Sequence, residues 1–293
     1  MSLFLELVIS GFALGAVYGL VALGFVLIFK STGIFNLAQG QLVLIGAFMA
    51  FAFSVQAGLP FWLAAGFALV FSFLLGFLIE RILLRPMIGQ PVLSLVMMTI
   101  GLSITLRALV LFIWGPLPHS YPPYLPQKGL HIGPAIVPES YIFGLIVSVI
   151  LLLCLFVFFK YSKIGLAMRA TADDQQVAQS LGIPVSRIFG IGWAISSLIA
   201  CVGGIVLGTL LSVTVLLGEV GLRSLPAAIL GGLESLPGVV IGGLLLGIIE
   251  NLSGGYLDSY IPGIKDVVPY VVMLIILIIR PYGLLGQKKI ERV

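Results

Sequence analysis

The fold of this chain is decided by its first long apolar stretch, Leu7–Phe29, which reads LVISGFALGAVYGLVALGFVLIF. This stretch contains no charged residue, and it is longer than the apolar core of a signal peptide, which has about 7 to 15 residues. A helix that crosses a bilayer needs about 20 mostly apolar residues. The sequence therefore predicts that this segment crosses the membrane and stays in the mature protein.

The composition of the whole chain favours the same solvent. Of its 293 residues, 60% are hydrophobic and only 9% are charged, whereas soluble domains carry about 25% charged residues. Further apolar segments that suit spanning helices lie at 37–57, 61–79, 92–114, 141–159, 188–212 and 267–285. We therefore predict an all-α, polytopic integral membrane protein with about seven full transmembrane helices, forming a single domain over residues 1–293.

Lysine and arginine residues orient these segments, because cytoplasmic loops carry an excess of them. We expect an outside N-terminus, a cytoplasmic C-terminus, an external loop over 115–140 and a cytoplasmic loop over 160–187. The formal net charge of +4 follows from this loop bias and does not indicate nucleic-acid binding. The residues assigned to the cytoplasmic side are Lys30, Arg81, Arg85, Lys160, Lys163, Arg169, Arg187, Arg280, Lys288, Lys289 and Arg292.

The stretch 225–250 does not fit a simple crossing, because the predicted orientation places both of its ends outside. Prolines in it interrupt helices, and glycines let backbones approach closely. We predict a broken, re-entrant pair of half-helices, of the kind that lines substrate paths in transporters. The alternative is one kinked spanning helix, which would place Asp258 and Lys265 in the cytoplasm. The residues expected to form this gate are Pro226, Gly231, Gly232, Pro237 and Gly238.

The sequence does not carry the motifs of an enzyme. No glycine-rich loop ends in Gly-Lys-Ser or Gly-Lys-Thr, which argues against ATP binding by this chain itself. His119 and His131 lack the spacing of a zinc site, and Cys154 and Cys201 lie in apolar runs without the neighbours of a metal or redox motif. We predict no catalytic residue, no metal site and no cofactor.

Polar residues within the predicted spans are mostly neutral. An ion-coupled carrier would place ionisable groups there, and Arg107 is the main exception, which we expect to snorkel or to pair with a carboxylate. Neutral polar groups hydrogen-bond across helices, and they can also line a path for a small neutral or zwitterionic solute. The substrate-pathway residues that we predict are Asn36, Gln39, Gln41, Thr99, Ser103 and Ser196.

The cytoplasmic loop contains one polar, partly helical stretch, Gly165–Ile183, which reads GLAMRATADDQQVAQSLGI. Asp173 and Asp174 suit the first turn of a short helix, and Gly182 suits its end. Such a helix could dock in a groove of a cytoplasmic motor, and an ordinary solvated loop is the alternative. The residues that we expect to couple to such a partner are Arg169, Ala172, Asp173, Asp174, Gln176, Ala178 and Gly182.

Three stretches together carry a resemblance to a known family: Gly15–Ala47, Gly165–Ile183 and Leu225–Glu250. Across essentially its whole length, the chain resembles the permeases of the branched-chain amino acid family of bacterial ABC importers. It looks like the smaller of the two permease types that are paired in them. The second stretch corresponds to the loop that members present to their ATPase subunits, although Gln176, Ala178 and Gly182 form only a degenerate version of the Glu-Ala-Ala-x-x-x-Gly motif.

The resemblance implies a fold like that of type II ABC importers and a place in the bacterial inner membrane. It implies a permease subunit that translocates branched-chain or other hydrophobic amino acids. The implied partners are a second permease subunit, two ATP-binding subunits at the cytoplasmic face and a periplasmic solute-binding protein. A passive channel for a small neutral solute, such as urea or an amide, is the alternative from a different class.

Overall fold

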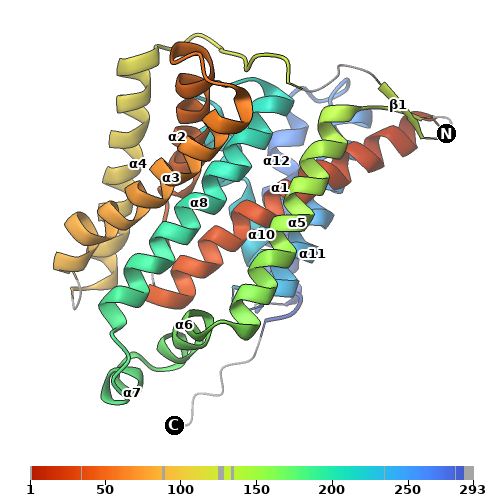
Figure 1. The fold of residues 1–293 in the computed structure, drawn as a ribbon. Helices are drawn as coiled ribbons and strands as arrows, with labels where there is room; N and C mark the ends of the chain where they lie inside the picture. Colours follow the sequence, from red (N-terminus) through yellow and green to blue (C-terminus); the bar gives the residue numbers. More distant parts are fainter. Residues whose placement is uncertain are drawn as a thin grey trace. The chain divides into compact units, whose positions relative to one another are not determined.

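The computed structural model describes residues 2–33, 35–87, 90–124, 129–132, 135–233, 235–280 and 282–286. These residues are mostly helical (Figure 1). The α-helices are α1 (Ser2–Thr32), α2 (Gln39–Phe51), α3 (Phe61–Ile79), α4 (Val92–Trp114), α5 (Glu139–Tyr161), α6 (Lys163–Asp173), α7 (Gln175–Ser180), α8 (Val185–Leu211), α9 (Leu217–Leu222), α10 (Ser224–Gly231), α11 (Leu236–Tyr256) and α12 (Ile264–Ile279).

Short segments of other geometry complete the fold. The π-helical segments η1 (Ala52–Gln56) and η2 (Glu80–Leu84) extend α2 and α3, and a 3-10 turn, η3 (Arg85–Met87), follows η2. The strands β1 (Gly129–Ile132) and β2 (Ala135–Pro138) pair antiparallel, so that Gly129 lies opposite Pro138. They lie in the predicted external loop, whose residues 125–128 and 133–134 are outside the described residues, as are Lys288, Lys289 and Arg292.

Among the described residues, 7 helices are long and apolar enough to cross a membrane. The predicted all-α, polytopic class is therefore confirmed. The identity of one span differs from the prediction: α11 is on this list, and α12, which covers most of the predicted last span, has only 16 residues. At a rise of about 1.5 Å per residue, α12 is shorter than the hydrocarbon core of a bilayer, which is about 30 Å thick.

The structure divides the predicted pair of half-helices into one short helix and one long helix. The interruption lies where the glycines suggested, since α10 has 8 residues and the chain turns at Gly232, whose φ is +96°. However, Pro237 lies in the first turn of α11, where its missing amide hydrogen costs no helical hydrogen bond. Ser235 caps this turn by accepting a hydrogen bond from the amide of Gly238. Because α11 then continues for 21 residues, the second segment is a full-length helix.

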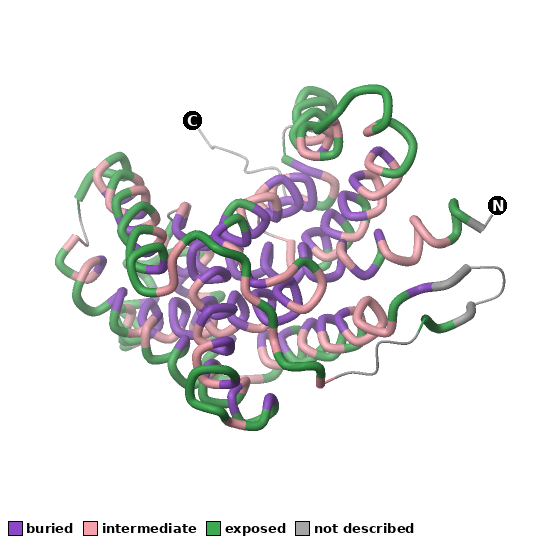
Figure 2. The backbone as a smooth tube through the Cα atoms, turned by 90° about the horizontal axis from the view of Figure 1, so that it is seen from above, coloured by how far each residue is buried: buried purple, intermediate pink, exposed green. Residues whose placement is uncertain are grey.

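The chain folds into two compact units. The first contains residues 1–26, 125–149 and 223–293, and the second contains residues 27–124 and 150–222. Helices α1 and α5 contribute to both. Within the helices of either unit, buried and exposed residues alternate along the length, as Figure 2 shows.

Glycines bring α1 and α11 into close contact in the first unit. A Cβ atom on Gly15 would lie 2.7 Å from the carbonyl oxygen of Gly243, and Gly247 packs against the same turn of α1. The amide of Asn251 extends this contact by donating a hydrogen bond of 3.1 Å to the carbonyl oxygen of Leu7. Small residues at such crossings allow the backbone contact that stabilises helix pairs in membranes.

Helix α8 is the central element of the second unit, where it packs against α2 and α3. Close approach again requires glycine: a Cβ atom on Gly76 of α3 would lie 2.5 Å from the carbonyl oxygen of Trp193. Trp193 is only 1% exposed. On the loop after α4, the hydroxyl of Tyr121 donates to the carbonyl oxygen of Ala47 at 3.0 Å, and burial raises the pKa of this hydroxyl well above its usual value.

Candidate functional site

Three of the predicted path residues meet where the chain breaks between α1 and α2. The side-chain oxygen of Gln39 accepts hydrogen bonds from the amide of Asn36 at 3.2 Å and from the hydroxyl of Ser196 at 3.0 Å. The amide of Gln39 donates to the carbonyl oxygen of Ser196 at 3.4 Å. Asn36 also accepts a bond from the amide of Ala38 at 3.0 Å. All three side chains are buried. We call Asn36, Gln39 and Ser196 together the polar knot.

Thr99 of α4 lies beside the same break. Its hydroxyl donates to the carbonyl oxygen of Val96 at 2.8 Å and is 3.4 Å from the carbonyl oxygen of Phe35. The amide of Leu37 donates to the Thr99 hydroxyl at 3.4 Å. Thr99 thus holds the residues that precede the polar knot, whereas Ser103, one turn further along α4, is half-buried.

Gln41 faces a different element, α9. A Cβ atom on Gly218 would lie 2.6 Å from the side-chain oxygen of Gln41, so the amide rests against the glycine backbone. Gln41 is 4% exposed, and its oxygen has no hydrogen-bond partner among the described residues. A buried acceptor without a donor costs about 1–3 kcal/mol. Of the predicted path residues, Gln41 therefore has a hydrogen-bonding capacity that the protein itself leaves unused.

The predicted coupling stretch forms two helices, α6 and α7, at one end of the second unit (Figure 1). Asp174 caps α7, because its carboxylate accepts hydrogen bonds from the amides of Gln176 at 2.8 Å and Val177 at 3.0 Å. Asp173 is instead the last residue of α6, and its side chain lies outside the described residues. The prediction that both aspartates open one helix is therefore wrong for Asp173.

The remaining coupling residues divide between the surface and the interior. Ala178 is 1% exposed and packs inward. Gly182 ends α7 with a φ of +83°, a left-handed conformation that glycine adopts without strain. The exposed members of the set are Arg169, Ala172, Asp174, Gln176 and Gly182.

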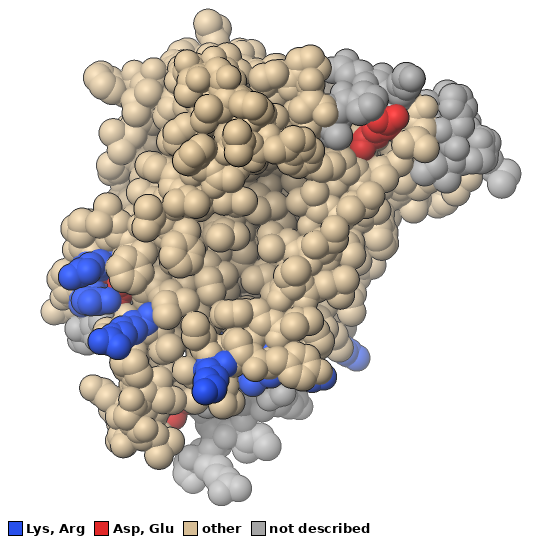
Figure 3. Space-filling view, viewed as in Figure 1, with Lys and Arg blue, Asp and Glu red and all other residues tan. Residues whose placement is uncertain are grey.

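Basic side chains surround this end of the second unit. Figure 3 shows lysine and arginine gathered at the end where Figure 1 places α6 and α7. The residues of the second unit that carry this charge are Arg81, Arg85, Lys160, Lys163, Arg169 and Arg187. The positive-inside rule would place such an end in the cytoplasm, and the cytoplasmic assignment of the 160–187 loop stays a prediction.

Two buried carboxylates escaped the sequence reasoning, which expected none deep in the spans. Glu80 of η2 is 1% exposed and forms an ion pair of 3.1 Å with Arg85. Glu250 of α11 is 6% exposed and pairs with Arg223 at 3.1 Å. Glu80 and Arg85 are 5 positions apart, so their pairing could be suspected from the sequence. Arg223 and Glu250 are 27 positions apart, and their pairing could not.

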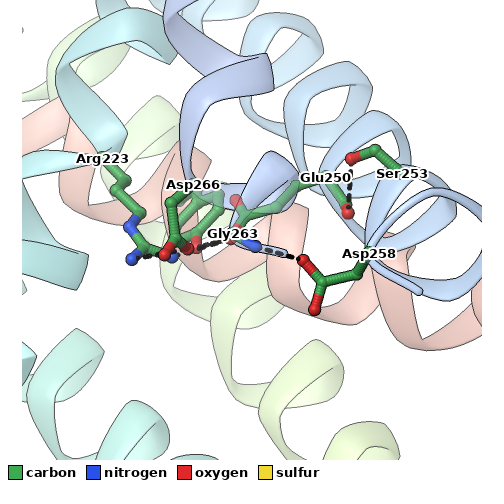
Figure 4. A network of polar contacts seen from close by, with 7 residues as sticks. Arg223, Glu250, Ser253, Asp258, Gly263 and Asp266 are labelled. Atoms are coloured by element: carbon green, nitrogen blue, oxygen red, sulfur yellow. Dashed lines mark hydrogen bonds and ion pairs between the residues drawn. The ribbon is translucent and has the colours of Figure 1, made fainter. Parts of the chain in front are cut away.

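The cluster around Glu250 links α1, α11 and α12 to the residue that precedes α10, and Figure 4 shows its ion pairs. Arg223, which precedes α10, contacts Glu250 of α11 and also Asp266 of α12, at 2.9 Å. The hydroxyl of Tyr18 on α1 donates to Glu250 at 3.1 Å. A buried charge persists only when it is paired in this way. On the second unit, Arg107 pairs with Glu219 at 3.1 Å, which is the carboxylate pairing expected for it.

The predicted gate residues pack α10 against its neighbours in the first unit. A Cβ atom on Gly232 would lie 2.7 Å from the amide nitrogen of Gly286, and the amide of Leu284 donates to the carbonyl oxygen of Leu230 at 2.8 Å. The turn before α11 therefore lies beside the segment that follows α12. Pro226, Gly231, Gly232 and Gly238 are buried, and Pro237 is exposed.

Comparisons with known proteins decide the family. A family model described as branched-chain amino acid transport system, permease component, matches residues 7–277. The chain belongs to this permease family. The high-affinity branched-chain amino acid transport system permease protein LivH of Escherichia coli K12 is 34% identical, over 99% of this permease and 98% of LivH. The permease protein BraD of Pseudomonas aeruginosa, with the same description, is 30% identical over 99% and 98%.

Other similarities are more distant. The nucleoside ABC transporter permease protein NupC of Lactococcus lactis is 29% identical over 50% of this permease and 48% of NupC. The solved structure of PsaBC from Streptococcus pneumoniae in complex with Fab has a TM-score of 0.51, covering 94% of this permease and 91% of that chain, with 15% identity. This likeness concerns the fold alone. The predicted family is thus confirmed, and the chain is a multi-pass membrane protein.

Proposed function

We propose that this permease is the membrane-spanning subunit of an ATP-driven importer in a bacterial inner membrane. Its solutes are branched-chain or other hydrophobic amino acids, delivered by a periplasmic binding protein. It pairs with a second permease subunit, a paralogue, and two ATP-binding subunits act at the cytoplasmic face. Membership of the family and the full-length similarity to LivH support this assignment.

One observation carries the proposal: the surface formed by α6 and α7. This segment is helical and capped, it protrudes at the basic end of the second unit, and it exposes apolar side chains to solvent. Val177 is 54% exposed and Leu181 is 76% exposed. Apolar side chains on a helix at a water-facing end favour docking into a groove of a partner protein. We place the ATP-binding subunits on this surface, with Arg169, Gln176 and the cap Asp174 as polar contacts.

The solute path follows the neutral polar groups of the second unit. Gln41, with its unused oxygen, is our first candidate for a contact with the solute, and Asn36, Gln39, Thr99, Ser103 and Ser196 line or support the same region. Among the described residues of the second unit, the buried carboxylate of Glu80 is paired with Arg85, so it is not free to hold a charged solute. Weak binding of the solute along the path suits a system in which the delivery protein selects the solute.

Gly182 provides the test. Replacing Gly182 with valine forces a β-branched side chain into a left-handed conformation, although nothing lies within 4 Å of the added Cβ atom. We expect the end of α7 to distort, so that solute no longer stimulates ATP hydrolysis by the purified complex. The matched control is Gly58→Val, because Gly58 has a φ of +67° and equally open surroundings in the loop before α3.

The control variant should retain stimulated hydrolysis at the wild-type rate per mole of complex. If Gly182→Val also retains it, α7 is not the docking surface and the proposal loses its main support.

A further inference from the structure

Glu80 and Arg85 form a partly buried ion pair that depends on an unusual turn of helix. In an α-helix, side chains three or four positions apart face each other, whereas these two residues are 5 apart. The π-helical geometry of η2 brings them together, since the amide of Arg85 donates to the carbonyl oxygen of Glu80. Single π-helical turns are rare and frequently lie at functional sites.

The guanidinium of Arg85 makes three contacts. Its Nε donates to one carboxylate oxygen of Glu80 at 3.3 Å, and its Nη2 donates to the other at 3.1 Å, so the pair is bidentate. Nη2 also donates to the carbonyl oxygen of Ser186 at 3.3 Å. Ser186 belongs to the first turn of α8. The pair therefore fastens the end of α3 to the beginning of α8.

The beginning of α8 follows α7 directly along the chain, after the turn at Leu181–Pro184. Helices α6 and α7 also both pack against α8. Any displacement of these two helices consequently reaches the first turn of α8. At this level α8 has Gly190, where a Cβ atom would lie 2.9 Å from the ring of Phe77 and 3.1 Å from the carboxylate of Glu80. The glycine thus makes room for the ion pair.

We propose that Glu80 and Arg85 are positioning residues that transmit movement of α6 and α7, through the first turn of α8, to the spanning helix α3. The inference rests on the proposed function, because it assigns the mechanical link between the ATP-binding subunits and the spans. The side chain of Glu80 is 2% exposed and that of Arg85 is 36% exposed, so water screens the pair only from one side. A bidentate pair fixes orientation as well as distance, and this is what a rigid link requires.

The test is the number of ATP molecules hydrolysed per leucine imported, measured in proteoliposomes that contain the complete complex with its binding protein. Leucine is the probe. Glu80→Gln keeps the shape of the side chain and removes its charge. We expect this ratio to rise about 2- to 30-fold, the range of coupling energies carried by individual positions within a transmitting network. Arg85→Lys keeps the charge but loses the bidentate geometry, and it should raise the ratio as well.

The matched control is Arg81→Gln. Arg81 lies next to Glu80 in η2 and is exposed, so this variant changes the charge of the same turn without touching the link. Its ratio should equal that of the wild type. Because the ratio does not depend on how much complex folds, simple destabilisation leaves it unchanged.

Combining Glu80→Gln with Arg85→Gln should cost no more than Glu80→Gln alone, because both changes break one link. The inference is overturned if Glu80→Gln and Arg85→Lys both keep the wild-type ratio, or if the effects of Glu80→Gln and Arg85→Gln add independently. A wild-type complex that imports no leucine with ATP would instead contradict the proposed function.

Discussion

At the scale of single residues, the polar knot shows how buried amides serve the fold. Asn36, Gln39 and Ser196 satisfy one another, so these three side chains stay hydrogen-bonded where the chain breaks between α1 and α2. Gln39 is the centre of the knot, since it contacts both other residues.

Replacing Gln39 with leucine should destabilise the protein by about 1–3 kcal/mol, because the partner groups lose their acceptor and donor while remaining buried. The measurement is the thermal unfolding midpoint of the detergent-solubilised protein. Thr105→Val serves as the control: Thr105 is exposed, and its hydroxyl donates to the carbonyl oxygen of Gly101 in its own helix. A midpoint for Gln39→Leu equal to that of the control would contradict the role of the knot.

The sequence identified these polar residues but not their pairing. Asn36 and Gln39 are close enough along the chain to suggest a cap, whereas Gln39 and Ser196 are separated by 157 positions. Glu250 was missed for a similar reason, since Arg223 lies 27 positions away and Tyr18 lies 232 positions away. Such partners are defined by helix packing, which a single sequence without its structure does not reveal.

At the scale of elements, glycine determines which helices can touch. The contact between α1 and α11 leaves no room for a side chain at Gly15, whereas the surroundings of Gly101 on α4 are open. Residue type alone does not distinguish these two glycines.

Gly15→Val should therefore cost about 1–3 kcal/mol through overpacking, seen as a lower unfolding midpoint and less folded protein in the membrane. Gly101→Val carries the same change of side chain at an open position and should differ little from the wild type. Equal midpoints for the two variants would mean that α1 and α11 do not make this close contact.

Helix ends show both the strength and the weakness of sequence patterns. Asp174 and Gly182 were expected near the two ends of the short cytoplasmic helix, and they are the cap and the terminal glycine of α7. The sequence pattern predicts that Pro237 interrupts a helix, but Pro237 lies where proline is favoured, in the first turn of α11. A proline predicts that a helix begins or ends nearby. Here the cap at Ser235 shows that a helix begins.

Asp174→Ala should loosen α7 by about 0.5–2 kcal/mol, the usual effect of removing an N-cap. Faster amide hydrogen exchange at Gln176 and Val177 would report the loss, with the exchange of α12 as an internal reference. Unchanged exchange at both amides would show that the Asp174 carboxylate does not cap the helix.

At the scale of the whole molecule, the full length of α11 favours a topology that differs from the predicted re-entrant pair. With 21 residues, α11 is about 31 Å long at the standard helical rise. This length matches the hydrocarbon core of a bilayer, so we expect the two ends of α11 to lie on opposite sides. The turn before it lies beside the segment that follows α12, and that segment leads to the basic C-terminus.

Cysteines placed at Ser235 and Tyr256, in a background with Cys154 replaced by alanine, should therefore react from opposite sides. We expect Ser235→Cys to be labelled from the cytoplasm and Tyr256→Cys from outside, using a membrane-impermeant maleimide on right-side-out and inverted vesicles. Labelling of both positions from one side would mean that α11 does not cross.

The central claim is that movement of the cytoplasmic helices α6 and α7 by ATP-binding subunits drives transport through the spans. The most direct test is leucine uptake by proteoliposomes that contain the permease, its paired permease and the binding protein, with or without the ATP-binding subunits. The account predicts accumulation against a gradient only when the ATP-binding subunits and ATP are both present. Rapid leucine flux through the permease without any ATP-binding subunit would contradict it.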